Sequence, residues 1–181
     1  LKVDVAYGGD SFVIVKSEDL GLVLARDEAR HIAEQGIAIT KAANEQLGFR
    51  HPLNAEWSHI SFCQIAGPLE YEAGIKTGKN AVAIQPGKLD RSPCGTGCSA
   101  RLAVLYRRGE IAVGETFIGR SIIDSRFECR IEELQVLKDG TEAVIPSLNG
   151  RAWITGVHQH MLDPDDPWPG GYRISDTWPR L

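Results

Sequence analysis

The stretch DRSPCGTGCSA, residues 90–100, places a carboxylate, Asp90, four residues before a thiol, Cys94. Gly95 and Gly97 follow, and their lack of side chains leaves room for a ligand to approach the backbone. If a helix begins here, the free amide N–H groups of its first turn can bind a carboxylate or another anion. The positive end of the helix dipole would also favour the thiolate of Cys94 over the thiol. With Asp90 available for a cationic group, the loop fits the charges of a zwitterionic amino acid.

This spacing alone leaves several interpretations of Cys94 open. The thiol could be a general base, or it could be the nucleophile of a cysteine hydrolase or transferase that uses a distant histidine as its base. A glycine-rich turn that leads into a helix can also carry a purely structural cysteine, in which case the chain is a binding module without catalysis. A nucleophile predicts a histidine beside the thiol, whereas a base does not require one.

The elements that would position this loop indicate an α+β fold. Apolar residues from Ala100 to Tyr106 predict a buried, central helix over residues 98–108, and a second helix is predicted over 27–47, ending at Gly48. The predicted strands cover residues 2–8, 11–16, 59–65, 80–87, 117–123, 127–137, 142–148 and 151–162. Turns are expected at Gly8-Gly9-Asp10 and, as hairpins, at Asp139-Gly140 and Asn149-Gly150.

Composition excludes several classes of protein. With 181 residues, 43% of them hydrophobic, and a net charge of −4, the chain has enough apolar residues for one core and lacks the basic stripe of a nucleic-acid binder. No apolar run reaches the length of a membrane span, and the N-terminus does not resemble a signal peptide. We therefore expect a cytoplasmic protein. Because the first residue is Leu1, we also expect the chain to be a fragment of a longer one.

The remaining reactive side chains receive structural interpretations. The spacing of Cys63, Cys98 and Cys129 is neither that of a disulfide framework nor that of paired metal ligands, so we expect reduced thiols packed in the core. His158 and His160 alternate on the last predicted strand and would share a face. No further ligand lies at zinc spacing from them, so no metal site is predicted.

Four stretches of the sequence resemble the proline racemase family, which includes 4-hydroxyproline epimerases and trans-3-hydroxy-L-proline dehydratases. They are AYGGDSFVIV (6–15), ANEQLGFRHP (43–52), GKNAVAIQPGKLDRSPCGTGCSA (78–100) and GRAWITGVHQHMLDPDDPWPGGYRISDTW (150–178). The resemblance covers essentially the whole chain, and the cysteine motif at its centre is the most specific part.

The resemblance implies a diaminopimelate-epimerase-like fold, in which a mostly antiparallel sheet wraps around a central helix. Such a unit is one half of a pseudo-symmetric, two-domain protein with the ligand in the cleft between its halves. Residues 1–150 would be the second catalytic half-domain, and residues 151–181 a returning strand and tail that pack on the first domain. That first domain, with a second cysteine in a Cys-Gly-His motif, is absent from these residues, so the chain alone is expected to be inactive. A homodimer is compatible with the family.

The resemblance also implies the roles of individual residues. Cys94 would be one of two opposed cysteines that remove and return the α-proton, without a cofactor or metal, while Gly95 and Thr96 donate backbone N–H groups to the substrate carboxylate. Asp90 would bind the substrate ammonium. His59 aligns with a substrate-contacting histidine, although an ordinary strand histidine is an equal interpretation.

The expected partner is thus a small imino acid, with no nucleic acid and no membrane. Dehydratase-like members carry threonine where this chain has Cys94, so the cysteine favours epimerisation or racemisation. The sequence GGDSF at residues 8–12 is more similar to the hydroxyproline epimerases, which favours 4-hydroxyproline over proline. The alternatives left open are proline racemisation, trans-3-hydroxyproline dehydration and hydrolysis by a cysteine nucleophile.

Overall fold

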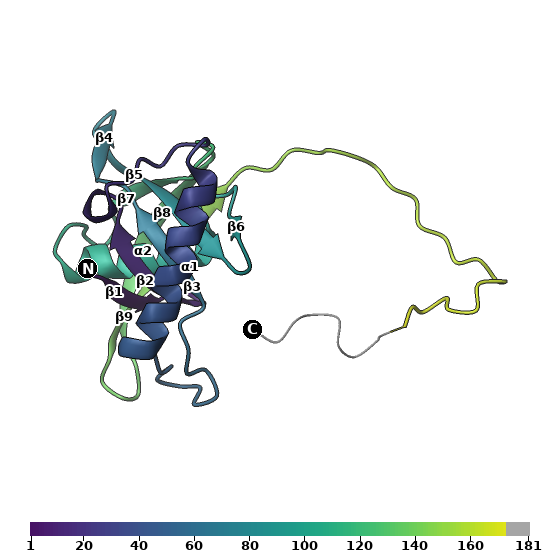
Figure 1. Ribbon diagram of the computed structural model, residues 1–181, viewed down its shortest axis with the longest axis horizontal. Helices are drawn as coiled ribbons and strands as arrows, with labels where there is room; N and C mark the ends of the chain where they lie inside the picture. The colour runs from purple at the N-terminus through teal and green to yellow at the C-terminus, as the bar shows by residue number, and fades with distance from the viewer. Residues whose placement is uncertain (173–181) are drawn as a thin grey trace. The chain divides into compact units, whose positions relative to one another are not determined.

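The computed structural model describes residues 1–172, and the chain divides into two units, Leu1–Arg151 and Ala152–Leu181. Each unit is described by itself. The first contains nine strands, two α-helices and one short 3₁₀ helix (Figure 1). In chain order the elements are β1 (Asp4–Tyr7), β2 (Ser11–Lys16), η1 (Glu18–Leu20), α1 (Ala29–Gln46), β3 (Phe62–Ala66), β4 (Glu70–Glu72), β5 (Ile75–Ile84), β6 (Lys88–Leu89), α2 (Gly95–Arg107), β7 (Thr116–Arg120), β8 (Arg126–Val136) and β9 (Glu142–Gly150).

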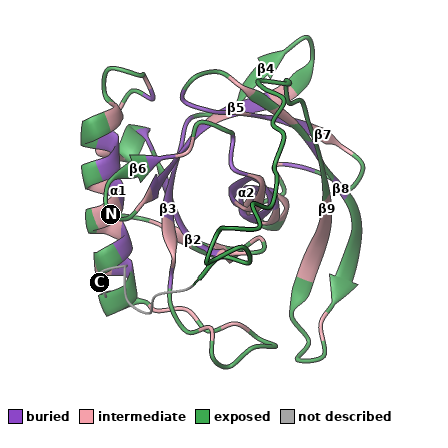
Figure 2. Ribbon diagram, turned by 90° about the vertical axis from the view of Figure 1, so that its right-hand side faces the viewer, coloured by how far each residue is buried: buried purple, intermediate pink, exposed green. Residues whose placement is uncertain are grey.

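The strands of the first unit form one curled sheet in the order β1-β2-β3-β5-β7-β8-β9, with β4 and β6 paired to β5. Figure 2 shows α2 inside the curl and α1 on the outer face of the sheet, where α1 packs against β3 and β5. Most neighbouring strands are antiparallel, whereas β2–β3 and β5–β7 are parallel. The expected α+β architecture around a central helix is therefore present, with a mixed sheet.

Strand β2 is buried on both faces because it lies between the two helices. Val13 and Val15 belong to the cluster that contains Ile32 of α1, while Phe12 and Ile14 belong to the cluster that contains Ala100 of α2. Successive side chains of a strand point to opposite faces. A strand covered on both sides therefore appears in the sequence as an unbroken apolar run, which explains FVIV.

Helix α2 is held inside the sheet by the buried guanidinium of Arg101. This side chain donates hydrogen bonds to the carbonyls of Lys79 at 3.0 Å and Gly67 at 2.6 Å and to the side-chain oxygen of Asn80. Burial lowers the pKa of Arg101 to about 10. A side chain at Gly78 would clash with the guanidinium, since its Cβ would lie 2.7 Å from an Arg101 nitrogen. Arg101 therefore fixes α2 to β5 and to the turn at Gly67.

Both predicted helices and the hairpin at Asp139-Gly140 are confirmed, whereas residues 151–162, predicted as a returning strand, form no strand in this structure. Asn149 and Gly150 do not form a hairpin either, because they pair with Glu128 and Phe127 at the end of β9. A strand needs a neighbouring edge for its hydrogen bonds. No described strand pairs with residues 151–162, so their alternating pattern produces no sheet structure here.

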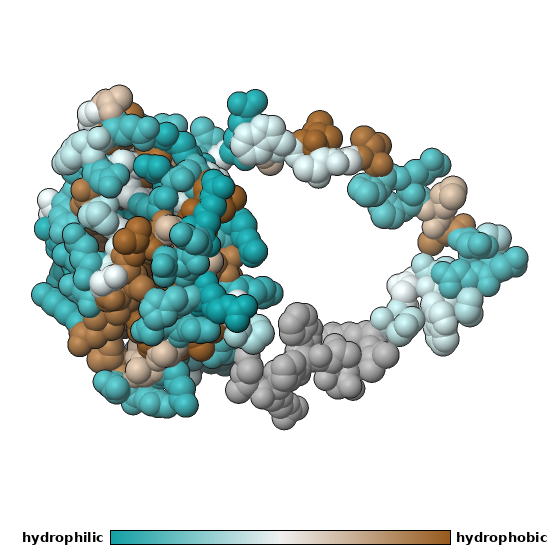
Figure 3. Space-filling model, turned by 45° about the horizontal axis from the view of Figure 1, so that its top comes forward, coloured by the Kyte–Doolittle hydropathy of each residue, from teal (hydrophilic) through white to brown (hydrophobic). Residues whose placement is uncertain are grey.

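The described part of the second unit is extended and exposes large aliphatic and aromatic side chains. Figure 3 shows several brown, hydrophobic groups along its thin arc. The exposed side chains are Trp153, Ile154, Val157, Met161, Leu162, Trp168 and Tyr172. The end of the predicted tail, from residue 173, lies outside the described residues. Within residues 1–172, no helix has the length and apolarity needed to cross a membrane.

Candidate active site

Cys94 caps the N-terminus of α2, as the sequence predicts. Its backbone has φ 64°, in the left-handed region that side chains other than glycine rarely adopt. The side chain is 8% exposed, and it packs beside Phe12 and Val82. The Cys94 N–H donates a hydrogen bond to the Ser92 hydroxyl oxygen at 3.1 Å. The thiol therefore sits at the end of the helix in a strained, well-supported conformation, a combination that recurs at functional sites.

The first turn of α2 leaves two amide groups for a ligand. The Cys98 N–H is the first to bond within the helix, to the Cys94 carbonyl at 2.8 Å, so the three amides before it have no helical acceptor. One of these, the Gly97 amide, hydrogen-bonds Cys94 and lowers the pKa of its thiol. The Gly95 and Thr96 N–H groups remain, and these are the two that the sequence analysis assigned to a substrate carboxylate.

Asp90 lies against the Cys94 thiol, and this contact changes the expected electrostatics. Burial first, and then the hydrogen bond from the thiol to Asp90 and the negative charge of Asp90, raise the pKa of Cys94 to about 11. A contact with the Thr96 hydroxyl, 3.7 Å from the sulfur, acts in the opposite direction. The expectation that the helix start favours the thiolate of Cys94 is therefore wrong for this structure, because burial and the neighbouring carboxylate raise the pKa more than the Thr96 hydroxyl and the Gly97 amide lower it.

The turn between β1 and β2 packs directly on the start of α2. A Cβ on Gly8 would stand 2.2 Å from the Thr96 carbonyl oxygen and 2.3 Å from the Ala100 nitrogen. The Cβ of a side chain at Gly9, where φ is 103°, would stand 3.0 Å from the Thr96 methyl group. The glycines of AYGGDSF are therefore required by the close approach of this turn to the helix N-terminus.

His59 lies apart from the described contacts of the thiol. It is exposed, it precedes β3 rather than lying in it, and its ring stacks on Trp57 with 5.6 Å between the ring centroids. Its carbonyl accepts a hydrogen bond from Ser11 at 2.8 Å. Among residues 1–172, the side chains of Asp90 and Thr96 are the partners of the Cys94 thiol, and no histidine is among them.

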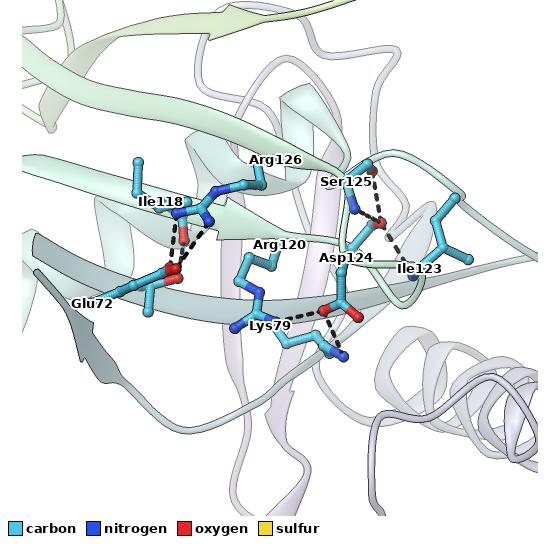
Figure 4. A network of polar contacts seen from close by, with 10 residues as sticks. Glu72, Lys79, Ile118, Arg120, Ile123, Asp124, Ser125 and Arg126 are labelled. Carbon is cyan, nitrogen blue, oxygen red and sulfur yellow. Dashed lines mark hydrogen bonds and ion pairs between the residues drawn. The ribbon is translucent and has the colours of Figure 1, made fainter.

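A polar network supports the segment before Cys94 from the loop that follows β7. Ser125 donates a hydrogen bond to the Arg91 carbonyl at 2.9 Å. In Figure 4, Asp124 is joined to Lys79 and Arg120, with distances of 2.9 Å and 2.7 Å. These ion pairs hold the loop against β5 and thereby fix the backbone that leads to the thiol.

Sequence reasoning missed one residue beside the thiol, Gln64 of β3. Its side chain is fully buried, faces α2 and lies beside Gly97 and Cys94. The signal in the sequence was a glutamine inside the apolar strand FCQIA, where a buried amide needs an explanation.

The other three cysteines lie in the core, as the sequence predicted, and His158 and His160 lie in the second unit. Cys63, Cys98 and Cys129 are free and buried. His158 and His160 stack on each other at 6.2 Å, although not on a strand. In the described part of the chain, no three side chains of histidine, cysteine, aspartate or glutamate are grouped as metal ligands.

Two solved structures are similar to this chain over nearly all of its length. The chain is similar to a hydroxyproline epimerase from Agrobacterium vitis, crystallised with bound trans-4-OH-L-proline, with 35% identity, a TM-score of 0.77 and coverage of 97% of this chain and 49% of that one. It is also similar to a probable proline racemase from Agrobacterium radiobacter K84, crystallised with bound carbonate, with 32% identity, a TM-score of 0.79 and coverage of 98% and 51%. The chain thus spans about half the length of these two proteins.

The family model described as proline racemase matches residues 1–173, which include both helices, every strand and the thiol loop. Since this match extends over nearly all of the sequence, the chain belongs to the proline racemase family.

Proposed function

We propose that this chain supplies one catalytic half of a 4-hydroxyproline epimerase, which inverts the α-carbon of its substrate without a cofactor. The observation that carries the proposal is the group formed by Cys94, Asp90 and the free amides of Gly95 and Thr96. The amides would bind the substrate carboxylate, Asp90 would bind the substrate ammonium, and the thiol would face the α-carbon between them.

Inversion requires removal of a proton from one face of the α-carbon and delivery of a proton to the other. One group cannot serve both faces, so the proposal requires a second thiol, from a domain outside this chain. Negative charge in the planar intermediate spreads toward the carboxylate, where the amides at the start of α2 stabilise it. In the reaction direction in which Cys94 delivers a proton, it must begin as a thiol, and its raised pKa suits that role.

Substrate binding would also change the electrostatics of Cys94. In the ligand-free site, the Asp90 charge acts on the thiol and raises its pKa. A bound ammonium group would offset this charge, so the thiolate would become more accessible when the substrate is present. Deprotonation of Cys94 would therefore be coupled to occupancy of the site.

The second half of the cleft is part of the proposal. By pseudo-symmetry, it would come from a diaminopimelate-epimerase-like first domain, on which residues 151–181 would pack as a strand and tail. The exposed apolar side chains of this segment, such as Trp153 and Val157, support that role, because large groups of exposed apolar side chains on a soluble protein usually mark an interaction surface. We further propose that the protein is cytoplasmic and that its substrate is a small imino acid. A homodimer is compatible with this proposal but is not required by it.

Proline racemisation is the second candidate, because the similarity to the probable proline racemase is nearly as extensive as that to the hydroxyproline epimerase. A hydrolase is less well supported, since no histidine contacts Cys94 among the described residues. Dehydration is disfavoured because dehydratase-like members carry threonine where this chain has Cys94. A threonine hydroxyl is a weaker base than a thiolate and would not return the proton.

The test is α-deuteration in D₂O by the natural full-length protein, with trans-4-hydroxy-L-proline and L-proline offered separately. We expect deuterium at the α-carbon, faster with hydroxyproline, and a loss of at least 100-fold in Cys94→Ser, in line with the contribution of a general acid–base group. Cys63→Ser is the matched control, because Cys63 lies in the cluster on the α1 side of the sheet. An unchanged rate in Cys94→Ser, or an acyl adduct on Cys94, would contradict the proposal.

A further inference from the structure

Gln64 occupies a position that the fold otherwise fills with apolar side chains. On β3 it pairs with Ile14 of β2 and Val82 of β5, and both neighbours belong to the apolar cluster that packs on α2. Because side chains at paired positions point to the same face of a sheet, the Gln64 amide also faces α2. The residue is 0% exposed.

The amide is directed at the helix start that carries the thiol. A Cβ on Gly97 would stand 2.9 Å from Gln64 Oε1 and 3.1 Å from Cys94 Sγ. The absent side chain of Gly97 therefore leaves the amide and the sulfur on either side of the same small space. Among residues 1–172, neither Oε1 nor Nε2 of Gln64 has a hydrogen-bond partner.

A purely structural role does not account for this arrangement. A buried polar group without a partner is unfavourable, and an apolar side chain of the same shape avoids that penalty. Methionine has the length of glutamine and would suit the surrounding Ile14 and Val82. The amide therefore points to an interaction that forms in a state other than the resting one.

We propose that Gln64 is a positioning residue for Cys94, which stabilises the thiolate that forms during the reaction. This inference rests on the proposed function, in which Cys94 alternates between thiol and thiolate. When Cys94 takes the α-proton, its sulfur becomes an anion, and Gln64 Nε2–H can donate to it. When Cys94 returns the proton, Oε1 can accept a hydrogen bond from the S–H group. A carboxamide offers both a donor and an acceptor, as a group that changes protonation requires.

The other ionisable groups around the sulfur do not provide this donor. The Asp90 carboxylate disfavours the thiolate, and Cys98, on the next turn of α2, interacts with Cys94 as a like charge. Arg101 is committed to carbonyls of β5 and Gly67. The Gly97 amide and the Thr96 hydroxyl already favour the thiolate, and Gln64 would add a donor from the sheet side.

The test compares Gln64→Met with the wild type in the natural full-length protein. The first readout is the rate of Cys94 alkylation by iodoacetamide between pH 7 and 10, followed by mass spectrometry of the Cys94 peptide, because only the thiolate reacts. We expect alkylation about tenfold slower at each pH below the thiol pKa, as expected for the loss of one hydrogen bond to a charged group. The kcat should fall by a similar factor, with little change in KM, while Tm stays the same or rises.

Thr77→Val is the matched control, because Thr77 is also buried and polar but donates to the Ile118 carbonyl in β7, away from the thiol. It should lower Tm and leave the alkylation profile unchanged. An unchanged profile and kcat in Gln64→Met would overturn the inference. Alkylation of Cys94 does not require turnover, so it tests the role of Gln64 separately from the proposed function. If Gln64→Met shifts the alkylation profile but the wild type deuterates neither substrate, the interaction of Gln64 with the thiolate stands and only the epimerase function is rejected.

Discussion

Replacement of Asp90 by asparagine separates the two roles that the structure combines in one carboxylate. In the ligand-free site, burial and Asp90 together raise the pKa of Cys94 from its ordinary value of 9.0 to about 11. Asparagine removes the charge and leaves the burial, so only part of this shift should disappear. A fall of about one pKa unit corresponds to about tenfold more thiolate at any pH well below the pKa. Removal of the entire shift would correspond to about 100-fold.

The same substitution should weaken substrate binding, because the substrate ammonium loses its charged partner. A hydrogen bond to a charged group contributes about 1.5–3 kcal/mol, which corresponds to an increase of roughly ten- to 100-fold in KM. Asp90→Asn should therefore alkylate faster at Cys94 and bind substrate more weakly. These opposite changes distinguish the variant from a damaged fold, in which faster alkylation would also extend to the buried Cys63.

The assay is iodoacetamide labelling of the natural full-length protein at pH 8, with each cysteine followed separately, together with initial rates of α-deuteration. Asp139→Asn removes the same charge from the exposed β8–β9 turn and should change neither readout. Slower or unchanged alkylation of Cys94 in Asp90→Asn would refute the assignment of Asp90 as a group that disfavours the thiolate.

Two further predictions concern the fold. Gly8→Ala should displace the β1–β2 turn from α2 and lower the free energy of unfolding by about 1–3 kcal/mol, because its Cβ would overlap backbone atoms of Thr96 and Ala100. Gly87→Ala is the control, because its Cβ would meet nothing within 4 Å. Thermal unfolding measures both variants, and equal Tm values would contradict the prediction. Burial raises the pKa of Cys63 to about 12, so its thiol favours the folded state below pH 9 and this contribution is lost progressively between pH 9 and 12. Over that window, the free energy of unfolding should fall more steeply in the wild type than in Cys63→Ala, by about 1.4 kcal/mol per pH unit, in denaturant titrations.

Sequence reasoning located the thiol loop because its signals are local. Pro93, two glycines and the apolar run from Ala100 predict a helix start at Cys94 without knowledge of distant residues. The same is true of α1 and of the turn at Asp139-Gly140. The pKa of Cys94 was predicted in the wrong direction, because it depends on the burial of the thiol in the cluster that contains Phe12 and Val82 and on its contact with Asp90, which tertiary packing determines.

Two other outcomes also depended on long-range packing. The place of Gln64 could not be predicted, since its direction depends on the pairing of β3 between β2 and β5 and on the contact with Gly97. The strand predicted over residues 151–162 has the right alternation, but a strand forms only where a partner edge is present. Local patterns thus identify the reactive loop, while the environment of the thiol is a property of the assembled sheet.

The left-handed backbone conformation of Cys94 is strained, so the residue proposed for catalysis is not the one that best fits the backbone at this position. Glycine adopts φ 64° without steric penalty, so Cys94→Gly would relieve backbone strain of about 1 kcal/mol, which offsets part of the cost of removing a buried side chain. Under the proposed function, that variant could no longer exchange the α-proton. A screen for thermal stability alone would therefore penalise loss of this cysteine only weakly, so an engineered form of this domain should be selected for turnover as well as for Tm.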